Sequence, residues 1–112
     1  RGDNGFIAYA GSKHAVARAV RLRSQQFGEV GVRLNAVAPG ATETPLLEGV
    51  RADPTWGAAL ESVPIPLGRP ARPQEIADVI LFLLSEGAAQ IHGSIVYVDG
   101  GSDAVMRPSG GF

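Results

Sequence analysis

The residues of this 112-residue chain best placed to do chemistry are a tyrosine and a lysine four positions apart. Lys13 is the only lysine beside nine arginines, and Tyr9 is one of two tyrosines. In a helix this separation is one turn, about 6 Å of rise, so phenol and ammonium share a face. A nearby ammonium favours the ionised phenol, which can then exchange a proton with a hydroxyl near neutral pH. The alternative is a solvated surface pair that does no chemistry.

The segment around this pair has the composition of a helix. Residues 8–27 contain no proline and are rich in alanine and arginine. Val16 and Val20 belong to an apolar stripe at helical spacing, which predicts packing against a second element. We expect Gly28 to end this helix.

A second group of candidate residues follows a predicted strand. Residues 32–38 alternate in character and are followed by a proline and a glycine, which predicts a strand that ends in a tight turn. The carboxyl ends of parallel strands are where α/β folds bind ligands, so backbone groups and two hydroxyls here are candidates. The alternative is an ordinary turn, in which Thr44 caps a helix that begins at Pro45. Both interpretations can hold together. The candidates are Pro39, Gly40, Ala41, Thr42 and Thr44.

The rest of the sequence predicts α/β layering. Prolines interrupt residues 41–73, where we expect short helices and a binding lid. The expected lid helices cover residues 45–50 and 54–62; a longer helix covers 73–84 and a buried strand covers 94–98. Residues 102–112 show no usable pattern. Two apolar parallel strands cannot form a covered sheet alone, so we expect further strands outside these 112 residues.

Composition excludes several classes of function. The formal net charge is -1, which argues against nucleic acid or an anionic membrane as partner. There is no cysteine, and two histidines far apart offer little for a metal, so we expect no metal site. The longest apolar run, residues 79–84, is too short to span a membrane, and no signal peptide opens the chain. We expect a single folding unit, soluble and cytoplasmic.

A few single residues have both a functional and a structural interpretation. His14 and His92 have no evident partner in the sequence, and we interpret both as structural. Trp56 fits either the wall of an apolar pocket or packing within the lid. The same two interpretations apply to a group of apolar residues in the lid: Leu46, Leu47, Leu60, Val63 and Ile65.

Four ordered motifs resemble the C-terminal half of a short-chain dehydrogenase/reductase. They are Tyr9-Ala10-Gly11-Ser12-Lys13, residues 32–40, Pro66-Leu67-Gly68-Arg69 with residues 73–77, and Gly93 with Val98-Asp99-Gly100-Gly101. Within that family, residues 38–47 and 103–108 are similar to bacterial 3α-hydroxysteroid dehydrogenase/carbonyl reductases. The resemblance implies the C-terminal part of a Rossmann-type, doubly wound parallel sheet, with residues 1–112 as one portion of a single domain.

The resemblance also implies roles for the candidates. The enzyme would move hydride between a nicotinamide cofactor, NAD with NADP not excluded, and a secondary alcohol or ketone such as a 3α-hydroxysteroid. Tyr9 would be the acid/base, and Lys13 would assist it and bind the nicotinamide ribose. Pro39, Gly40 and Ala41 would lie along the nicotinamide. Thr42 and Thr44 would lie near its carboxamide or the diphosphate.

The same resemblance marks what is missing. The family's glycine-rich phosphate loop, the residue that selects NAD or NADP, and the catalytic serine all precede its tyrosine, and only eight residues precede Tyr9 here. Ser12 lies inside the motif and is not that serine. We therefore expect the isolated chain to be inactive and the whole protein to form a homodimer or homotetramer. The alternative function is a non-catalytic, nucleotide-binding or scaffold member of the same fold.

Overall fold

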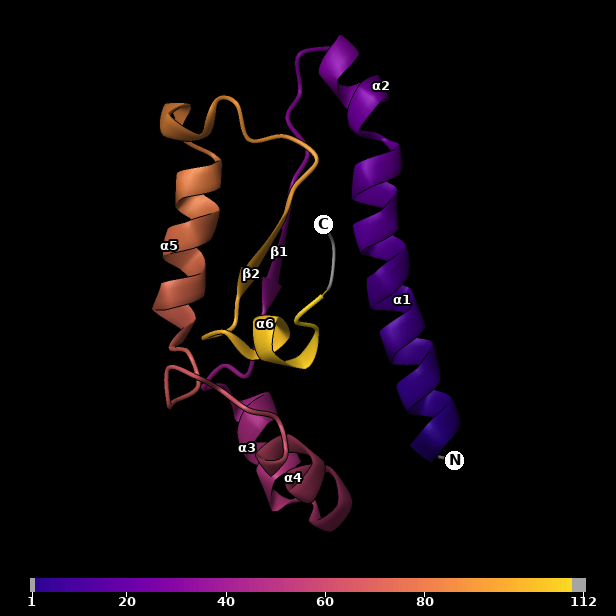
Figure 1. Cartoon of the computed structure of the whole chain (residues 1–112), viewed down its shortest axis with the longest axis vertical. Helices are drawn as coiled ribbons and strands as arrows, with labels where there is room; N and C mark the ends of the chain where they lie inside the picture. The colour runs from indigo at the N-terminus through magenta and orange to yellow at the C-terminus, as the bar shows by residue number, and fades with distance from the viewer. Residues whose placement is uncertain (1, 110–112) are drawn as a thin grey trace. The chain divides into compact units, whose positions relative to one another are not determined.

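The computed structural model describes residues 2–109, which form helices and one pair of strands, an α/β composition (Figure 1). Contacts divide the chain into two compact units. The first comprises Arg1–Ala36 and Leu83–Val96, and the second comprises Val37–Phe82 and Tyr97–Phe112. The expected α/β fold is confirmed, whereas the assignment of residues 1–112 to one part of a single domain stays a prediction.

The first helical segment is longer than predicted and is divided in two. Helix α1 runs over Gly2–Leu22 and α2 over Ser24–Glu29, with Arg23 between them. The expected stop at Gly28 is wrong, because Gly28 lies inside α2. The helix ends instead at Glu29, and the chain turns away at Gly31, whose φ of 74° is left-handed and suits glycine. Its N–H donates to Gly28 O and that of Val32 donates to Phe27 O, the paired bonds of a Schellman cap.

Strands β1 (Ala36–Pro39) and β2 (Ile95–Val98) pair in parallel. The direction follows from the hydrogen bonds: Ala36 N donates to Ser94 O, and Gly40 N donates to Val98 O, so both strands advance together. The predicted strand, residues 32–38, began four residues before β1 begins and ended one residue before β1 ends. Residues 33–35 are held by other bonds: the Asn35 amide group accepts from Ser94 N and donates to Ile91 O.

The predicted lid helices are present, as α3 (Pro45–Ala52) and α4 (Pro54–Glu61). Thr44 caps α3 by accepting a bond from Leu47 N, and Asp53 caps α4. The cap interpretation of Thr44, with Pro45 first in the helix, is therefore confirmed. The two helices pack closely, since a Cβ added at the buried Gly57 would lie 2.6 Å from Arg51 O.

The long helix lies close to where the sequence predicted it, whereas the tail differs from the prediction. Helix α5 covers Pro73–Leu83, and a 3-10 turn, η1, covers Glu86–Ala88. The tail forms a short helix, α6 (Ser102–Met106), which the sequence did not indicate. Residues 110–112 of that tail lie outside the described residues. Among residues 2–109, no helix is long and apolar enough to cross a membrane.

Few side chains of the described chain are buried. The buried apolar residues are Val20, Leu47, Leu83 and Ala88. Helix α5 leaves large apolar side chains exposed at Ile80, Leu81 and Phe82, and Leu84 just after the helix is exposed as well. Additional strands would cover apolar side chains of this kind, and those strands, expected from the sequence, stay a prediction.

His92 provides a long-range bond that its sequence context did not reveal. Its Nδ1 accepts the Leu34 N–H at 3.0 Å, so Nε2 carries the proton and donates to Ser24 O at 2.7 Å. A Cβ at Gly28 would lie 3.3 Å from Nε2, which explains a glycine within α2. His92 is therefore structural, as predicted.

We expect His92→Ala to destabilise the protein by about 1–3 kcal/mol, because it leaves the partly buried Leu34 N–H without its acceptor and removes the bond to Ser24 O. The free energy of unfolding in urea measures the loss. His14→Ala is the matched control: His14 lies exposed on α1 and should change stability by less than about 0.5 kcal/mol. Equal losses of stability in both variants would contradict the role of His92 in joining Leu34 to Ser24.

Candidate active site

Tyr9 and Lys13 share one face of α1, as the spacing predicted. The Lys13 Nζ lies 5.3 Å from the centroid of the Tyr9 ring, and Tyr9 is 65% exposed. The intervening Ser12 Oγ donates to Tyr9 O at 2.7 Å, so its hydroxyl is engaged with the helix backbone. The pair is thus preformed by the helix alone, and both functional groups remain accessible to a ligand.

The candidates after β1 form a connected loop in the second unit. The Thr42 hydroxyl donates to Gly40 O at 3.0 Å. A parallel bridge joins Thr42 to Ala71: Ala71 N donates to Ala41 O, and Glu43 N donates to Ala71 O. The Thr44 hydroxyl accepts from Leu47 N and keeps its own hydrogen available. Across residues 2–109, the Ala41 and Thr42 N–H groups have no acceptor, so the loop presents free donors.

Gly40 lies where the ends of β1 and β2 approach most closely. A Cβ at this position would lie 2.7 Å from Asp99 Cβ and 2.8 Å from Asp99 Cα. Asp99 is itself fixed, since its carboxylate accepts bonds from Gly101 N and Asp103 N at the start of α6. The loop therefore leaves β1 against a rigid backbone. Sequence reasoning missed this role of Asp99, although an aspartate before two glycines is a turn signal.

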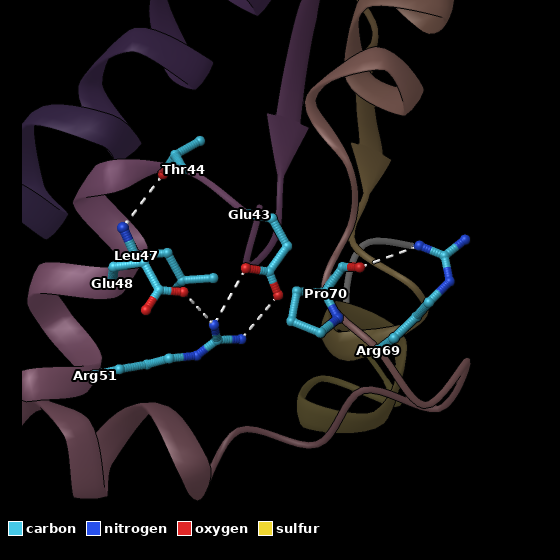
Figure 2. Close-up of polar contacts among 7 residues, drawn as sticks. All are labelled: Glu43, Thr44, Leu47, Glu48, Arg51, Arg69 and Pro70. Atoms are coloured by element: carbon cyan, nitrogen blue, oxygen red, sulfur yellow. Dashed lines mark hydrogen bonds and ion pairs between the residues drawn. The ribbon is translucent and has the colours of Figure 1, made fainter.

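An ion cluster ties the loop to α3 (Figure 2). The Arg51 Nη2 and Nη1 donate to Glu43 Oε1 and Oε2 at 2.9 and 3.1 Å, a two-pronged pair. Nη1 also bonds Glu48 at 2.8 Å. The hydrogen bonds from Arg51 hold the pKa of Glu43 below its usual value. Sequence reasoning missed this cluster, because Glu43 and Arg51 are eight residues apart and belong to different elements.

A second ion cluster fixes the start of α5. The Arg69 guanidinium donates to both oxygens of Glu75 at 2.8 Å, and Arg72 N donates to Glu75 Oε1 at 2.8 Å. The latter is the return bond of a capping box. The bonds from Arg69 have the largest effect and the bond from Arg72 N adds to it. Together they hold the pKa of Glu75 far below its usual range. Arg69 also donates to Pro70 O (Figure 2).

This lowered pKa predicts a pH-dependent contribution to stability. Because the folded-state pKa lies below the ordinary 4.5, the contribution is present above pH 4.5 and is lost as the pH falls through the folded value. We expect Glu75→Gln to lower the urea midpoint at pH 7, with the difference from wild type shrinking below pH 4.5. Glu61→Gln, on an exposed α4 carboxylate, is the control and should show no such trend. A pH-independent difference for Glu75→Gln would contradict the assignment.

The structure therefore assembles each candidate group within its own unit. Tyr9 and Lys13 meet on α1, and the five loop candidates lie together between β1 and α3. Within residues 2–109, no three histidine, aspartate or glutamate side chains form a group that could hold a metal ion.

A family model described as Enoyl-(Acyl carrier protein) reductase matches residues 1–103. The chain belongs to the short-chain dehydrogenase/reductase family. The resemblance based on the four motifs is confirmed, and with it the Rossmann-type fold of which this chain represents a portion.

The chain is similar to dehydrogenases of bacteria. It is 53% identical over 107 residues to the 3-alpha-hydroxysteroid dehydrogenase/carbonyl reductase of Comamonas testosteroni, covering 96% of this chain and 42% of the relative. It is 42% identical over 104 residues to the cis-4-hydroxycyclohexanecarboxylate dehydrogenase of Sinomonas cyclohexanicum, covering 93% and 41%. The chain thus spans about two fifths of the length of these relatives.

The chain is also similar to solved structures of dehydrogenases. The 3-alpha-hydroxysteroid dehydrogenase from Pseudomonas sp. B-0831, complexed with NADH, is 50% identical with a TM-score of 0.88, covering 92% of this chain and 41% of that one. A putative 2-deoxy-d-gluconate 3-dehydrogenase from Agrobacterium tumefaciens with bound NADP is 38% identical with a TM-score of 0.76, covering 86% and 39%.

Proposed function

We propose that the protein containing this chain is an NAD(P)-dependent oxidoreductase that interconverts a secondary alcohol and a ketone, with a 3α-hydroxysteroid or similar carbonyl compound as substrate. The observation that carries the proposal is the Tyr9–Lys13 pair, with Nζ 5.3 Å from the ring centroid in a chain of this family. The similarity to a 3-alpha-hydroxysteroid dehydrogenase/carbonyl reductase supports the substrate class.

In this proposal Tyr9 exchanges a proton with the substrate oxygen. In the oxidation direction its phenolate accepts the hydroxyl proton, and in the reduction direction its phenol donates a proton to the ketone oxygen. Lys13, fixed one helical turn away, stabilises the phenolate by its positive charge and contacts the nicotinamide ribose. The bound nicotinamide cofactor supplies or accepts the hydride at the carbon that bears this oxygen.

The loop after β1 offers a donor set that fits a dinucleotide. Backbone atoms of Pro39, Gly40 and Ala41 would lie along the nicotinamide, with the free N–H groups of Ala41 and Thr42 as donors. The Thr44 hydroxyl hydrogen would serve a carboxamide or diphosphate oxygen, because the Thr44 oxygen already caps α3. NAD is the proposed cofactor; the NADH and NADP bound to two relatives support a nicotinamide dinucleotide of either kind.

The test uses the full-length protein with a 3α-hydroxysteroid such as androsterone, NAD or NADP, and absorbance at 340 nm. Turnover with one cofactor supports both the reaction and the substrate class. Turnover only with other secondary alcohols overturns the steroid assignment. Nucleotide binding without turnover over a panel of secondary alcohols overturns the enzymatic proposal in favour of the scaffold alternative. The cytoplasmic location and the homodimer or homotetramer stay predictions.

A further inference from the structure

The structure points to Arg51 as a positioning residue for the proposed cofactor loop: we propose that its ion pair with Glu43 holds Thr42 and Thr44 in the geometry that binds the dinucleotide. This inference rests on the proposed function for its ligand. It concerns two residues that were not among the predicted site residues, and it is carried by three observations in the second unit.

The first observation is the position of Glu43. It stands between Thr42 and Thr44, and its N–H is bonded to Ala71 O, so its backbone belongs to the loop. Its carboxylate reaches both terminal nitrogens of Arg51, at 2.9 and 3.1 Å (Figure 2). Two parallel bonds between planar groups fix orientation as well as distance. The side chain of Arg51 therefore restrains the segment that carries both threonines.

The second observation is the position of Arg51 itself, near the end of α3. Its backbone oxygen lies against Gly57, where any Cβ would come within 2.6 Å. Arg51 thus contacts the loop through its side chain and α4 through its backbone. The third observation is the cap at the other end of α3, where Thr44 accepts from Leu47 N. Together these contacts anchor the loop to both ends of one helix and to the α3–α4 packing.

The Arg51–Glu43 ion pair is expected to affect ligand binding more than it affects the stability of the fold. The Arg51 and Glu43 side chains are 39% and 42% exposed, and exposed ion pairs contribute little to folding. An unpaired carboxylate beside the proposed diphosphate site would, however, repel the ligand. Arg51 could therefore act by orientation or merely by neutralising Glu43. The two roles predict opposite effects when Glu43 loses its charge.

The experiment measures the NADH dissociation constant and amide hydrogen exchange of the cofactor-free, full-length protein for the wild type and five variants. We expect Arg51→Gln and Glu43→Gln each to weaken NADH binding about three- to fivefold, and the double variant to be no worse than either alone. Exchange at the Glu43 and Leu47 amides should rise by a similar factor in all three. Glu48→Gln is the matched control, because it removes the other partner of Arg51 and leaves the Glu43 bonds intact.

Each outcome decides the inference. Tighter binding in Glu43→Gln would overturn positioning in favour of charge neutralisation, and additive effects in the double variant would overturn it by showing that the two side chains act independently. Unchanged exchange in Arg51→Gln, or an equal effect of Glu48→Gln, would also overturn it. Failure of the wild type to bind either NADH or NADPH would overturn the proposed function instead, and the exchange measurements would still test the restraint on the loop. Arg51→Lys should recover only part of the effect, since an ammonium cannot form both parallel bonds.

Discussion

Replacing Tyr9 by phenylalanine reduces kcat of the full-length protein by about a thousandfold, the expected result if its hydroxyl exchanges the substrate proton. Positioned acid/base groups typically contribute factors of about 100 to 10,000. The substitution removes one oxygen from a side chain that is 65% exposed on α1, so folding should be unaffected. The dissociation constant for NADH should change less than about threefold, since Lys13 and the loop donors remain. Steady-state kinetics and cofactor titration measure the two quantities.

Tyr97→Phe is the matched control for this experiment. Tyr97 is the other tyrosine, is 47% exposed, and accepts a bond from Arg107 at 2.9 Å. Its loss should leave kcat within about twofold of wild type, since the proposal gives Tyr97 no part in the reaction. If Tyr9→Phe retained most of the activity, the solvated-pair interpretation of Tyr9 and Lys13 would hold and the proposed acid/base role would be wrong.

Replacing Gly40 by alanine should destabilise the protein by about 1–3 kcal/mol and weaken cofactor binding. The new methyl group would lie 2.7 and 2.8 Å from Cβ and Cα of Asp99, and Asp99 is held by its bonds at the start of α6. Neither atom is the end of a flexible side chain, so the strand ends must separate. That movement stretches the Gly40 N–H bond to Val98 O and displaces the loop that follows.

Gly49→Ala provides the comparison. Gly49 lies inside α3, and a Cβ there has nothing within 4 Å. Alanine should stabilise this helix by about 0.5–1 kcal/mol, because it restricts the unfolded chain without a clash. Urea unfolding of both variants should therefore give changes of opposite sign. If Gly40→Ala left the free energy of unfolding unchanged, β1 and β2 would tolerate separation at this end.

The similarity to dehydrogenases covers about two fifths of each relative, and this share determines which functions can be tested on the chain alone. The described residues hold a candidate acid/base pair and one candidate cofactor loop, whereas the phosphate loop and catalytic serine expected for the family precede the tyrosine. Experiments on activity therefore belong to the full-length protein.

Features that depend on near neighbours in the chain could be predicted from the sequence. Lys13 follows Tyr9 by four positions, about one helical turn, so their proximity follows from α1 alone. Thr44 before Pro45 is a local cap signal, and the cap bond is present. The lid helices and α5 began at prolines for the same reason, since a proline in the first helical position needs no N–H partner.

The tertiary structure alone decided features that depend on residues far apart in the chain. Strand β1 begins late because Leu34 and Asn35 bond to residues 91–94 through side chains, which no period-2 pattern encodes. Gly28 lies inside α2, where an added Cβ would come within 3.3 Å of His92 Nε2. Local propensities act between neighbours, whereas these bonds join groups separated by 56 to 68 residues. The partner of each of these groups is therefore set only when folding brings the two segments together.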